Sequence, residues 1–282
     1  MDGIIIINKP IGITSYDCIR HAKRVFKTGK IGHTGTLDPF ASGLLVLCVG
    51  KATKLVTKLI EADKTYTGTI RFNEFYDTYD ITGKLLEKRN DIIDESLLIE
   101  TSKLFIKKYE QMPPIYSAIK VDGKKLYEYA RENKEVEIKK RSVEVYDFKI
   151  TNRVNEAEYN FETSVSKGTY IRSLIVDIAE SMGNIAVLKT LTRTIVDKFK
   201  LDDAVDLENL TVDNLISIEE LYKYSPKLIV NEYVSKLAKN GIYFDERQIE
   251  TDEDFLVYNE NNELIALYEV VGLNKYKPLI IF

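Results

Sequence analysis

Three stretches of alternating apolar and polar residues constrain the fold of this chain more than any other feature of its sequence. In 64–72, Tyr66 and Phe72 fall on one side of the alternation, and threonines and an arginine fall on the other. A period of two is typical of a strand with one buried face. Two further alternating runs, 136–150 and 156–166, follow each other closely, which favours adjacent antiparallel strands. The sequence therefore predicts a largely antiparallel sheet.

Helical signals lie between and around these runs. Thr14 followed by Asp17 is a capping-box pattern, which predicts a helix over 15–26. Apolar residues also recur at helical spacing in 52–60 and in 169–182. Strands and helices therefore mix without a regular βαβ alternation, and this mixture indicates an α+β fold.

The net charge of −4 is unevenly distributed over the 282 residues. Residues 201–274 contain 17 acidic and 5 basic side chains, so the rest of the chain carries +8. A basic body with an acidic C-terminal segment is compatible with nucleic-acid binding through the body. The Ser225-Pro226 pair marks a turn before a segment rich in short strand patterns. We therefore expect two domains, 1–224 and 225–282.

Several classes of protein are excluded by composition. Two cysteines and two histidines are too few for a disulfide scaffold or a zinc cluster. No apolar run approaches the ~18 residues of a membrane span, and the N-terminus lacks the pattern of a signal peptide. We therefore expect a cytoplasmic protein without a metal or a membrane partner.

The glycine-rich stretch 32–43 contains one carboxylate, Asp38, followed by Pro39. Two interpretations of these residues are open. Asp-Pro is a common turn pair, so the aspartate could simply cap a tight turn, and the residues alone favour this reading. Alternatively, the glycines hold the carboxylate rigidly at the edge of a sheet for nucleophilic or general-base chemistry.

A resemblance to a known family supports the second interpretation. The stretch GHTGTLDPFASGLL closely resembles the signature of TruB-type pseudouridine synthases, in which the aspartate is catalytic. Similar stretches follow the family order over about 1–221: IIINKPIGITS, DKTYTGTIRF, QMPPIYSAIKVDGKKLYEYAR, SKGTYIRSLIVDIAESMG and LTRTIVDKF. Their spacing suits the bacterial tRNA enzyme better than its longer guide-RNA relatives.

The resemblance implies both a fold and a reaction. The fold would be that of pseudouridine synthases, with a mixed, largely antiparallel central sheet flanked by helices and a small C-terminal PUA-like β domain. The reaction would convert uridine to pseudouridine at position 55, in the T-arm loop of tRNA, after the base is flipped out. Asp38 would be the essential carboxylate, and no cofactor or metal would be needed. We expect a monomer whose partner is tRNA.

The resemblance also implies roles for other residues. Arg172 would pair with Asp38 and keep it ionised. Tyr66 would stack on the target uracil, although its place in the alternation alone would make it a core residue. The remaining substrate-binding residues would be a histidine beside the space that the base leaves, two residues that line the base pocket, and a lysine that supports its floor: His33, Tyr170, Leu191 and Lys9.

A basic group on the predicted helix 15–26 and just beyond it is a candidate track for RNA phosphates. A solvated helix face is an equally good interpretation of these residues without the resemblance. The group consists of Arg20, Lys23, Arg24, Lys27 and Lys30.

The chain departs from the family at two places. Asn73 and Tyr76 stand where a glycine and a threonine are usual, and the C-terminal segment is unusually acidic for an RNA-binding module. Two other classes of function remain open: a tRNA-binding folding helper, and a glycoside hydrolase. The hydrolase usually needs a second carboxylate, and the loop around Asp38 has none.

Overall fold

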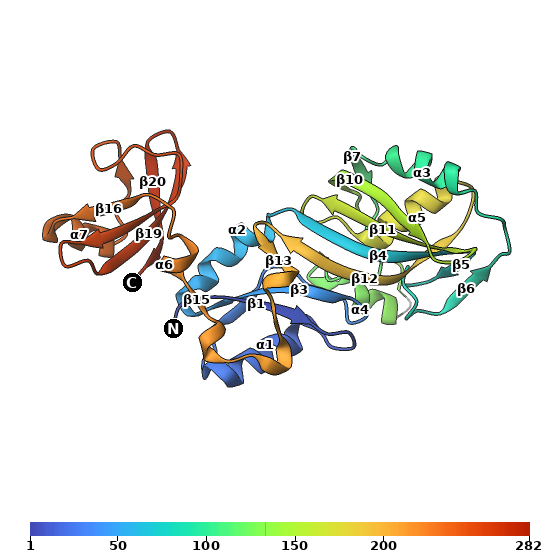
Figure 1. The fold of residues 1–282 in the computed structure, drawn as a ribbon, viewed down its shortest axis with the longest axis horizontal. Coiled ribbons are helices and arrows are strands. Elements are labelled where there is room, and N and C mark those ends of the chain that lie inside the picture. Colours follow the sequence, from blue (N-terminus) through green and yellow to red (C-terminus); the bar gives the residue numbers. More distant parts are fainter. Residues whose placement is uncertain (133) are drawn as a thin grey trace.

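The structure is a computed structural model that describes residues 1–132 and 134–282. The molecule is elongated, with a large sheet and its helices making up most of it and a smaller C-terminal sheet at the end where the N-terminus lies (Figure 1). In the part of the chain that is described, no helix has the length and apolar character needed to cross a membrane.

The larger sheet has the strand order β14-β1-β3-β12-β4-β11-β10-β7, and three short strands pair at its sides. Neighbours in this sheet are antiparallel except for β1–β14 and β3–β12. The predicted α+β fold with a mixed, largely antiparallel sheet is therefore confirmed. Its strands are β1 (Gly3–Lys9), β2 (Ile31–His33), β3 (Ser42–Val49), β4 (Lys64–Phe72), β7 (Lys108–Gln111), β10 (Arg141–Arg153), β11 (Glu158–Val165), β12 (Ala186–Val196), β13 (Phe199–Lys200), β14 (Val205–Asp206) and β15 (Ile216–Ser217).

Several helices pack an apolar face against the larger sheet. Ile19 and Ala22 of α1 pack with Ile7 and Leu47 of the sheet, and Leu174 of α5 packs with the central strands. The helices are α1 (Ser15–Phe26), α2 (Val56–Ile60), α3 (Glu95–Lys103), α4 (Leu126–Arg131), α5 (Ile171–Ser181), α6 (Ile218–Leu221) and α7 (Glu232–Lys239), with 3-10 turns η1 (Gly50–Leu55), η2 (Leu201–Asp203), η3 (Leu207–Asn209) and η4 (Val212–Asn214).

The start of α1 is fixed by the predicted capping box. Thr14 Oγ1 accepts a hydrogen bond from the backbone N–H of Asp17 at 3.1 Å, and Asp17 Oδ2 accepts one from the N–H of Thr14 at 2.8 Å. We expect Thr14→Ala to lower the free energy of unfolding by about 1 kcal/mol, because a helical N–H loses its partner. Urea titration would measure this loss. Thr14→Ser keeps the hydroxyl and should retain most of the stability; an equal loss in both variants would contradict the capping role.

The C-terminal segment forms its own sheet, in the order β16-β18-β19-β20-β17. One of its faces packs on its own core around Phe255, while Leu256 and Leu267 pack in a second core together with Ile4 and Val46 of the larger sheet. The small C-terminal β domain is therefore confirmed, and apolar packing attaches it to the body. The predicted boundary at 224/225 lies between α6 and β16 and stays a prediction. The strands are β16 (Lys227–Val230), β17 (Phe244–Asp245), β18 (Phe255–Asn259), β19 (Leu264–Gly272) and β20 (Lys275–Ile281).

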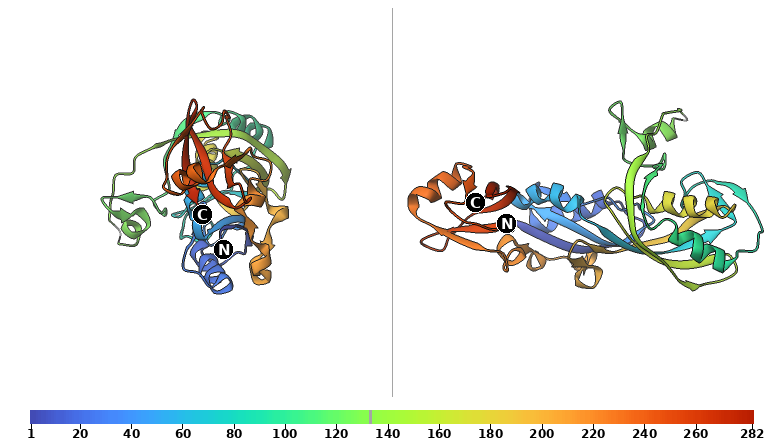
Figure 2. Two further views of the ribbon diagram at one scale, coloured as in Figure 1. Left: turned by 90° about the vertical axis from the view of Figure 1, so that its left-hand side faces the viewer. Right: turned by 90° about the horizontal axis from the view of Figure 1, so that it is seen from above.

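Two predicted strands are shorter in the structure. The run 136–150 is a strand only from Arg141, because its partner β7 ends at Gln111, which pairs with Arg141. The apolar and polar residues of 115–121 also predict a strand, and only its last two residues form one. The green segment that carries β8, β9 and α4 stands out from the sheet (Figure 2). The short hairpins are β5 (Glu74–Tyr76) with β6 (Leu85–Lys88), and β8 (Lys120–Val121) with β9 (Lys124–Lys125).

Candidate active site

The loop that carries Asp38 joins β2 to β3 and is tied to the start of α1. Ser15 Oγ accepts a hydrogen bond from the N–H of Leu37 at 2.9 Å and donates one to the carbonyl oxygen of the same residue at 3.2 Å. The N–H of Gly12 donates to the carbonyl oxygen of Pro39 at 2.7 Å. Backbone contacts on both sides therefore fix the position from which the Asp38 side chain projects.

A glycine is required at the end of this loop. Gly43 has φ +103°, and a Cβ atom there would lie 2.4 Å from the carbonyl oxygen of Arg193. The close approach arises because Gly43 and Arg193 are paired in the parallel ladder between β3 and β12. The glycine therefore lets the loop end directly on the central strand of the sheet.

Asp38 faces Arg172, which lies in the first turn of α5. The distance between Asp38 Oδ2 and Arg172 Nη2 is 2.9 Å. The guanidinium also lies 3.5 Å from Asp80 Oδ2, and it donates to the carbonyl oxygens of Thr78 at 2.9 Å and Tyr116 at 3.0 Å. Arg172 is therefore held in one orientation by four groups, and the Asp38 carboxylate is positioned by a buried, fixed partner.

Burial raises the pKa of Asp38 above its ordinary value. The Arg172 guanidinium acts against this rise, and the nearby Asp80 carboxylate adds to it. The resemblance implied that Arg172 would keep Asp38 ionised; the guanidinium acts in that direction, and the role stays a prediction. Burial is the larger effect, however, so Asp38 takes up its proton at a higher pH than an ordinary aspartate does.

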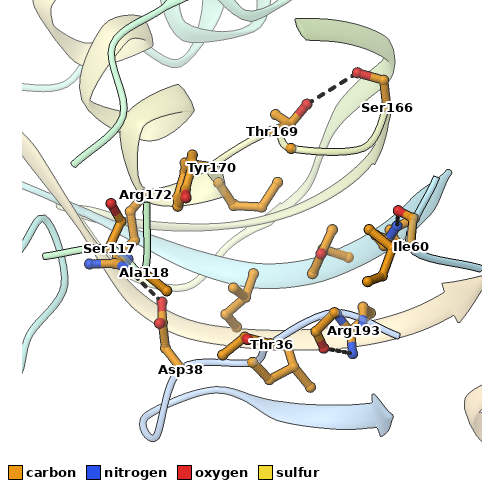
Figure 3. Close-up of a pocket in the computed structure, with 17 residues that line it drawn as sticks. Thr36, Asp38, Ile60, Ser117, Ala118, Ser166, Thr169, Tyr170, Arg172 and Arg193 are labelled. Atoms are coloured by element: carbon orange, nitrogen blue, oxygen red, sulfur yellow. Dashed lines mark hydrogen bonds and ion pairs between the residues drawn. The ribbon is translucent and has the colours of Figure 1, made fainter. Parts of the chain in front are cut away.

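Asp38 and Arg172 lie at the edge of a cavity of about 280 Å³ (Figure 3). Tyr66 of β4, Leu191 of β12 and Tyr170, the residue before α5, line its walls. Burial raises the pKa of Tyr170, so its phenol stays protonated at neutral pH. The structure thus brings together five of the residues that the sequence analysis assigned to the site, from segments far apart in the chain.

Two of the assigned residues, Lys9 and His33, are not among the residues that line this cavity. Lys9 is fully buried, and its ammonium donates to the carbonyl oxygens of Pro10 at 2.9 Å and Ile13 at 2.8 Å. His33 Nδ1 accepts a weak hydrogen bond from the N–H of Gly35 at 3.3 Å, and burial lowers the pKa of the imidazole. Both side chains thus support the loops around Asp38, and the imidazole is neutral at neutral pH.

The predicted basic group lies on the outer face of α1 and just after it. Arg20 is paired with Asp17, and together with Lys23 and Arg24 they surround a shallow depression of the surface. Lys27 and Lys30 are exposed beyond the end of the helix. The basic side chains therefore lie on the surface, outside the cavity.

Three residues of the site were missed by the sequence analysis. Asp80 is buried against Arg172, and Lys64 and Arg193 line the cavity. A strand period of two would have indicated the last two, because Lys64 precedes Tyr66 by two positions and Arg193 follows Leu191 by two. Within 1–132 and 134–282, three or more histidine, cysteine, aspartate or glutamate side chains nowhere gather in a way that could hold a metal ion.

The chain is similar to known proteins over nearly its whole length. Residues 23–171 match the model of the TruB family pseudouridylate synthase N-terminal domain. The chain is 42% identical over 283 residues to tRNA pseudouridine synthase B of Onion yellows phytoplasma, with both chains covered completely. It is 36% identical to the protein of the same name from Bacillus subtilis, with 95% of this chain and 93% of the relative covered.

Solved structures share the fold. A chain of the Cbf5-Nop10-Gar1 complex matches with a TM-score of 0.69 at 23% identity, over 99% of this chain and 83% of that chain. A chain of an H/ACA RNP bound to a substrate RNA containing 2′-deoxyuridine matches with a TM-score of 0.68 at 22% identity, over the same shares. The extent of the family match and the identity to its members show that this chain belongs to the TruB family of pseudouridylate synthases.

Proposed function

We propose that this pseudouridine synthase isomerises the uridine at position 55, in the T-arm loop of tRNA, and that Asp38 is its essential carboxylate. The observation that carries the proposal is the Asp38–Arg172 pair, with 2.9 Å between Oδ2 and Nη2, at the edge of a cavity lined by Tyr66 and Leu191. The relatives named tRNA pseudouridine synthase B support tRNA as the substrate.

The chemistry of the reaction suits these residues. The bond between N1 of uracil and C1′ of ribose breaks, the base turns, and C5 bonds to C1′. A proton leaves C5 and N1 takes one up, so the product is an isomer of the substrate. No electrons are gained or lost overall. Asp38 supplies the carboxylate that acts on the ribose or the ring, and the walls of the cavity keep the detached uracil in place and exclude water. Tyr66, beside the base, receives or relays the C5 proton.

The target base has to leave its stack before it can reach Asp38, because the carboxylate lines the edge of a cavity that a stacked base cannot enter. In the proposal, the uracil lies between Tyr66 and Leu191, with Tyr170 closing the pocket. His33, next to the loop and neutral, occupies the side from which the base departs and stacks on the RNA there. Lys9 keeps the floor of the site in place.

The tRNA backbone is proposed to follow the basic surface of α1 toward this cavity. Lysine and arginine side chains bind phosphates without reading sequence, which suits an enzyme that recognises a shape common to many tRNAs. The group on α1 is formed by Arg20, Lys23, Arg24, Lys27 and Lys30. We further propose a monomer that works in the cytoplasm without a metal or cofactor.

We expect the purified chain to form pseudouridine at position 55 of an unmodified tRNA transcript, in the presence of EDTA and without a nucleotide. Carbodiimide labelling followed by primer extension reports this as a stop beside position 55. A transcript with cytidine at that position is the matched control and should give no stop. A stop at a different uridine, or none at all, would contradict the proposed site.

A further inference from the structure

Two buried cations lie at the side of the cavity away from Asp38. Lys64 of β4 and Arg193 of β12 both line the cavity, with 8% and 1% of their surfaces exposed. Figure 3 places Arg193, and the Ile60 carbonyl that binds Lys64, away from the Asp38–Arg172 pair. The cavity therefore has a carboxylate with its arginine at one end and two further cations at the other.

Among the described residues, neither cation forms a salt bridge with a carboxylate; Asp63 and Asp197 act on Lys64 only from a distance. The Lys64 ammonium donates to the carbonyl oxygens of Ile60 at 2.9 Å and of Ala62. Arg193 donates from Nε to the carbonyl oxygen of Leu44 at 2.8 Å and from Nη2 to that of Gly35 at 3.1 Å. An ammonium has three N–H donors and a guanidinium five. Donors on both side chains, including Arg193 Nη1, therefore have no partner among the described residues.

The two charges also oppose each other. Burial, together with the charge of Arg193, lowers the pKa of Lys64 to about 8, although Asp63 and Asp197 act in the other direction. Two desolvated cations side by side are unfavourable unless an anion joins them. The positive charge of Lys64 and Arg193 is therefore not compensated by an adjacent anionic group of the described protein, and a bound anion would stabilise it.

The backbone leaves room for such an anion. Gly35 adopts φ +131°, and a Cβ atom there would lie 3.5 Å from Arg193 Nη1 and 3.7 Å from Lys64 Cε. The loop that carries Asp38 therefore passes beside both cations without placing a side chain between them. A ligand in the cavity can reach both groups.

We propose that Lys64 and Arg193 form a subsite for a phosphodiester group next to the target uridine. The inference rests on the proposed function, because the RNA strand that delivers the uridine brings this group with it. A phosphodiester carries a full negative charge on oxygens that accept from arginine and lysine. A uracil carbonyl is neutral and would leave most of the positive charge of Lys64 and Arg193 uncompensated. The subsite thus holds the flipped nucleotide by its backbone while Tyr66 and Leu191 enclose its base.

The test removes one negative charge from the RNA and, separately, one positive charge from the protein. T-arm hairpins are synthesised with a neutral methylphosphonate on the 5′ or the 3′ side of the target uridine, and their affinities are compared with that of the unmodified hairpin. For the unaltered chain, we expect one of the two positions to weaken binding by about tenfold, as for loss of one charge-assisted contact. For Lys64→Gln, the same modification should change the affinity less than twofold. The slope of log affinity against log salt concentration should also become shallower, by the amount expected for the loss of about one phosphate contact.

Lys58→Gln is the matched control, because Lys58 lies on the neighbouring helix α2 and pairs with Asp254 outside the cavity. It should respond to the methylphosphonate as the unaltered chain does. Equal weakening in Lys64→Gln and the unaltered chain, or no weakening at either position, would overturn the proposal. The second measurement needs no variant, so it holds even if Lys64→Gln folds poorly.

A third RNA separates the two sources of acceptor oxygen. This hairpin carries a target base that lacks O4. If it binds the unaltered chain more weakly than the unmodified hairpin does, but binds Lys64→Gln equally well, then Lys64 and Arg193 bind the base and the phosphodiester assignment is wrong. The pseudouridine assay at position 55 is independent of these affinity measurements. A chain that modifies position 55 but shows no coupling with the methylphosphonate would contradict only the subsite.

Discussion

Replacing Asp38 with asparagine is expected to lower the single-turnover rate of pseudouridine formation by at least about 10³-fold, because the amide is neutral and a poor nucleophile and base. The affinity for tRNA should change little, since the substitution keeps the shape of the side chain. Stability should change by no more than about 1 kcal/mol, because Asp38 is only half-buried and Arg172 keeps Asp80 and two carbonyl oxygens as partners. Tritium release from tRNA labelled at C5 of uridine measures the rate, and filter binding measures the affinity.

The control for this variant is Asp213→Asn, which alters an exposed carboxylate outside the cavity. It should retain the full rate. An Asp38→Asn enzyme that works at the rate of the unaltered chain would remove the central residue from the proposed mechanism, whereas loss of tRNA binding together with activity would instead indicate a role in holding the substrate.

Substituting Arg172 is expected to affect both stability and the pH dependence of the reaction. Its guanidinium lies between Asp38 and Asp80 with only 6% of its side-chain surface exposed. Arg172→Gln would leave the two carboxylates facing each other without a cation. We expect the free energy of unfolding to fall by about 3–5 kcal/mol, as is usual when one partner of a buried pair is removed. Urea titration measures this loss.

The pH profile separates an electrostatic role of Arg172 from a purely structural one. In the unaltered chain, the rate should fall as pH decreases through the raised pKa of Asp38, because the carboxylate takes up a proton. Without the guanidinium that opposes this rise, the pKa of Asp38 should increase further. The acidic limb of the single-turnover profile should therefore move to higher pH in Arg172→Gln, measured on the fraction of protein that is folded.

Arg71→Gln provides a matched arginine control, because Arg71 pairs with Glu158 and Glu74 outside the cavity and is partly exposed. The acidic limb of its pH profile should lie at the same pH as in the unaltered chain, and its free energy of unfolding should fall by no more than about 1 kcal/mol. A limb that stays in place in Arg172→Gln would contradict the assigned effect of the guanidinium on Asp38.

The sequence predicted best those elements whose signals are local. Helix α1 begins after Thr14 and ends at Phe26 as expected, because the cap and the apolar face both lie within the segment. Strand β4 likewise matches its alternating run. The end of β10, by contrast, depends on its partner β7, which no local pattern reports. Strand β12 was not assigned at all, although it lies at the centre of the large sheet and carries Leu191 and Arg193.

The candidate site shows the same division. The glycines around Asp38 indicate a tight, fixed loop, but the residues alone could not choose between a turn and a reactive group. The distance between Asp38 and Arg172 is a property of the folded sheet and helix, so only the family resemblance could predict the pair before the structure was known. The second carboxylate beside Arg172 was not predicted, because Asp80 reaches the guanidinium only through tertiary packing.

A crystal structure of the Asp38→Asn variant bound to an unmodified T-arm hairpin would show where the target uridine lies relative to position 38. We expect the uracil of the target uridine to lie outside its stack, between Tyr66 and Leu191, with C1′ of its ribose within about 4 Å of the side chain at position 38. A target uridine still stacked within the RNA loop, or a base bound outside the cavity that Asp38 and Arg172 border, would contradict this expectation.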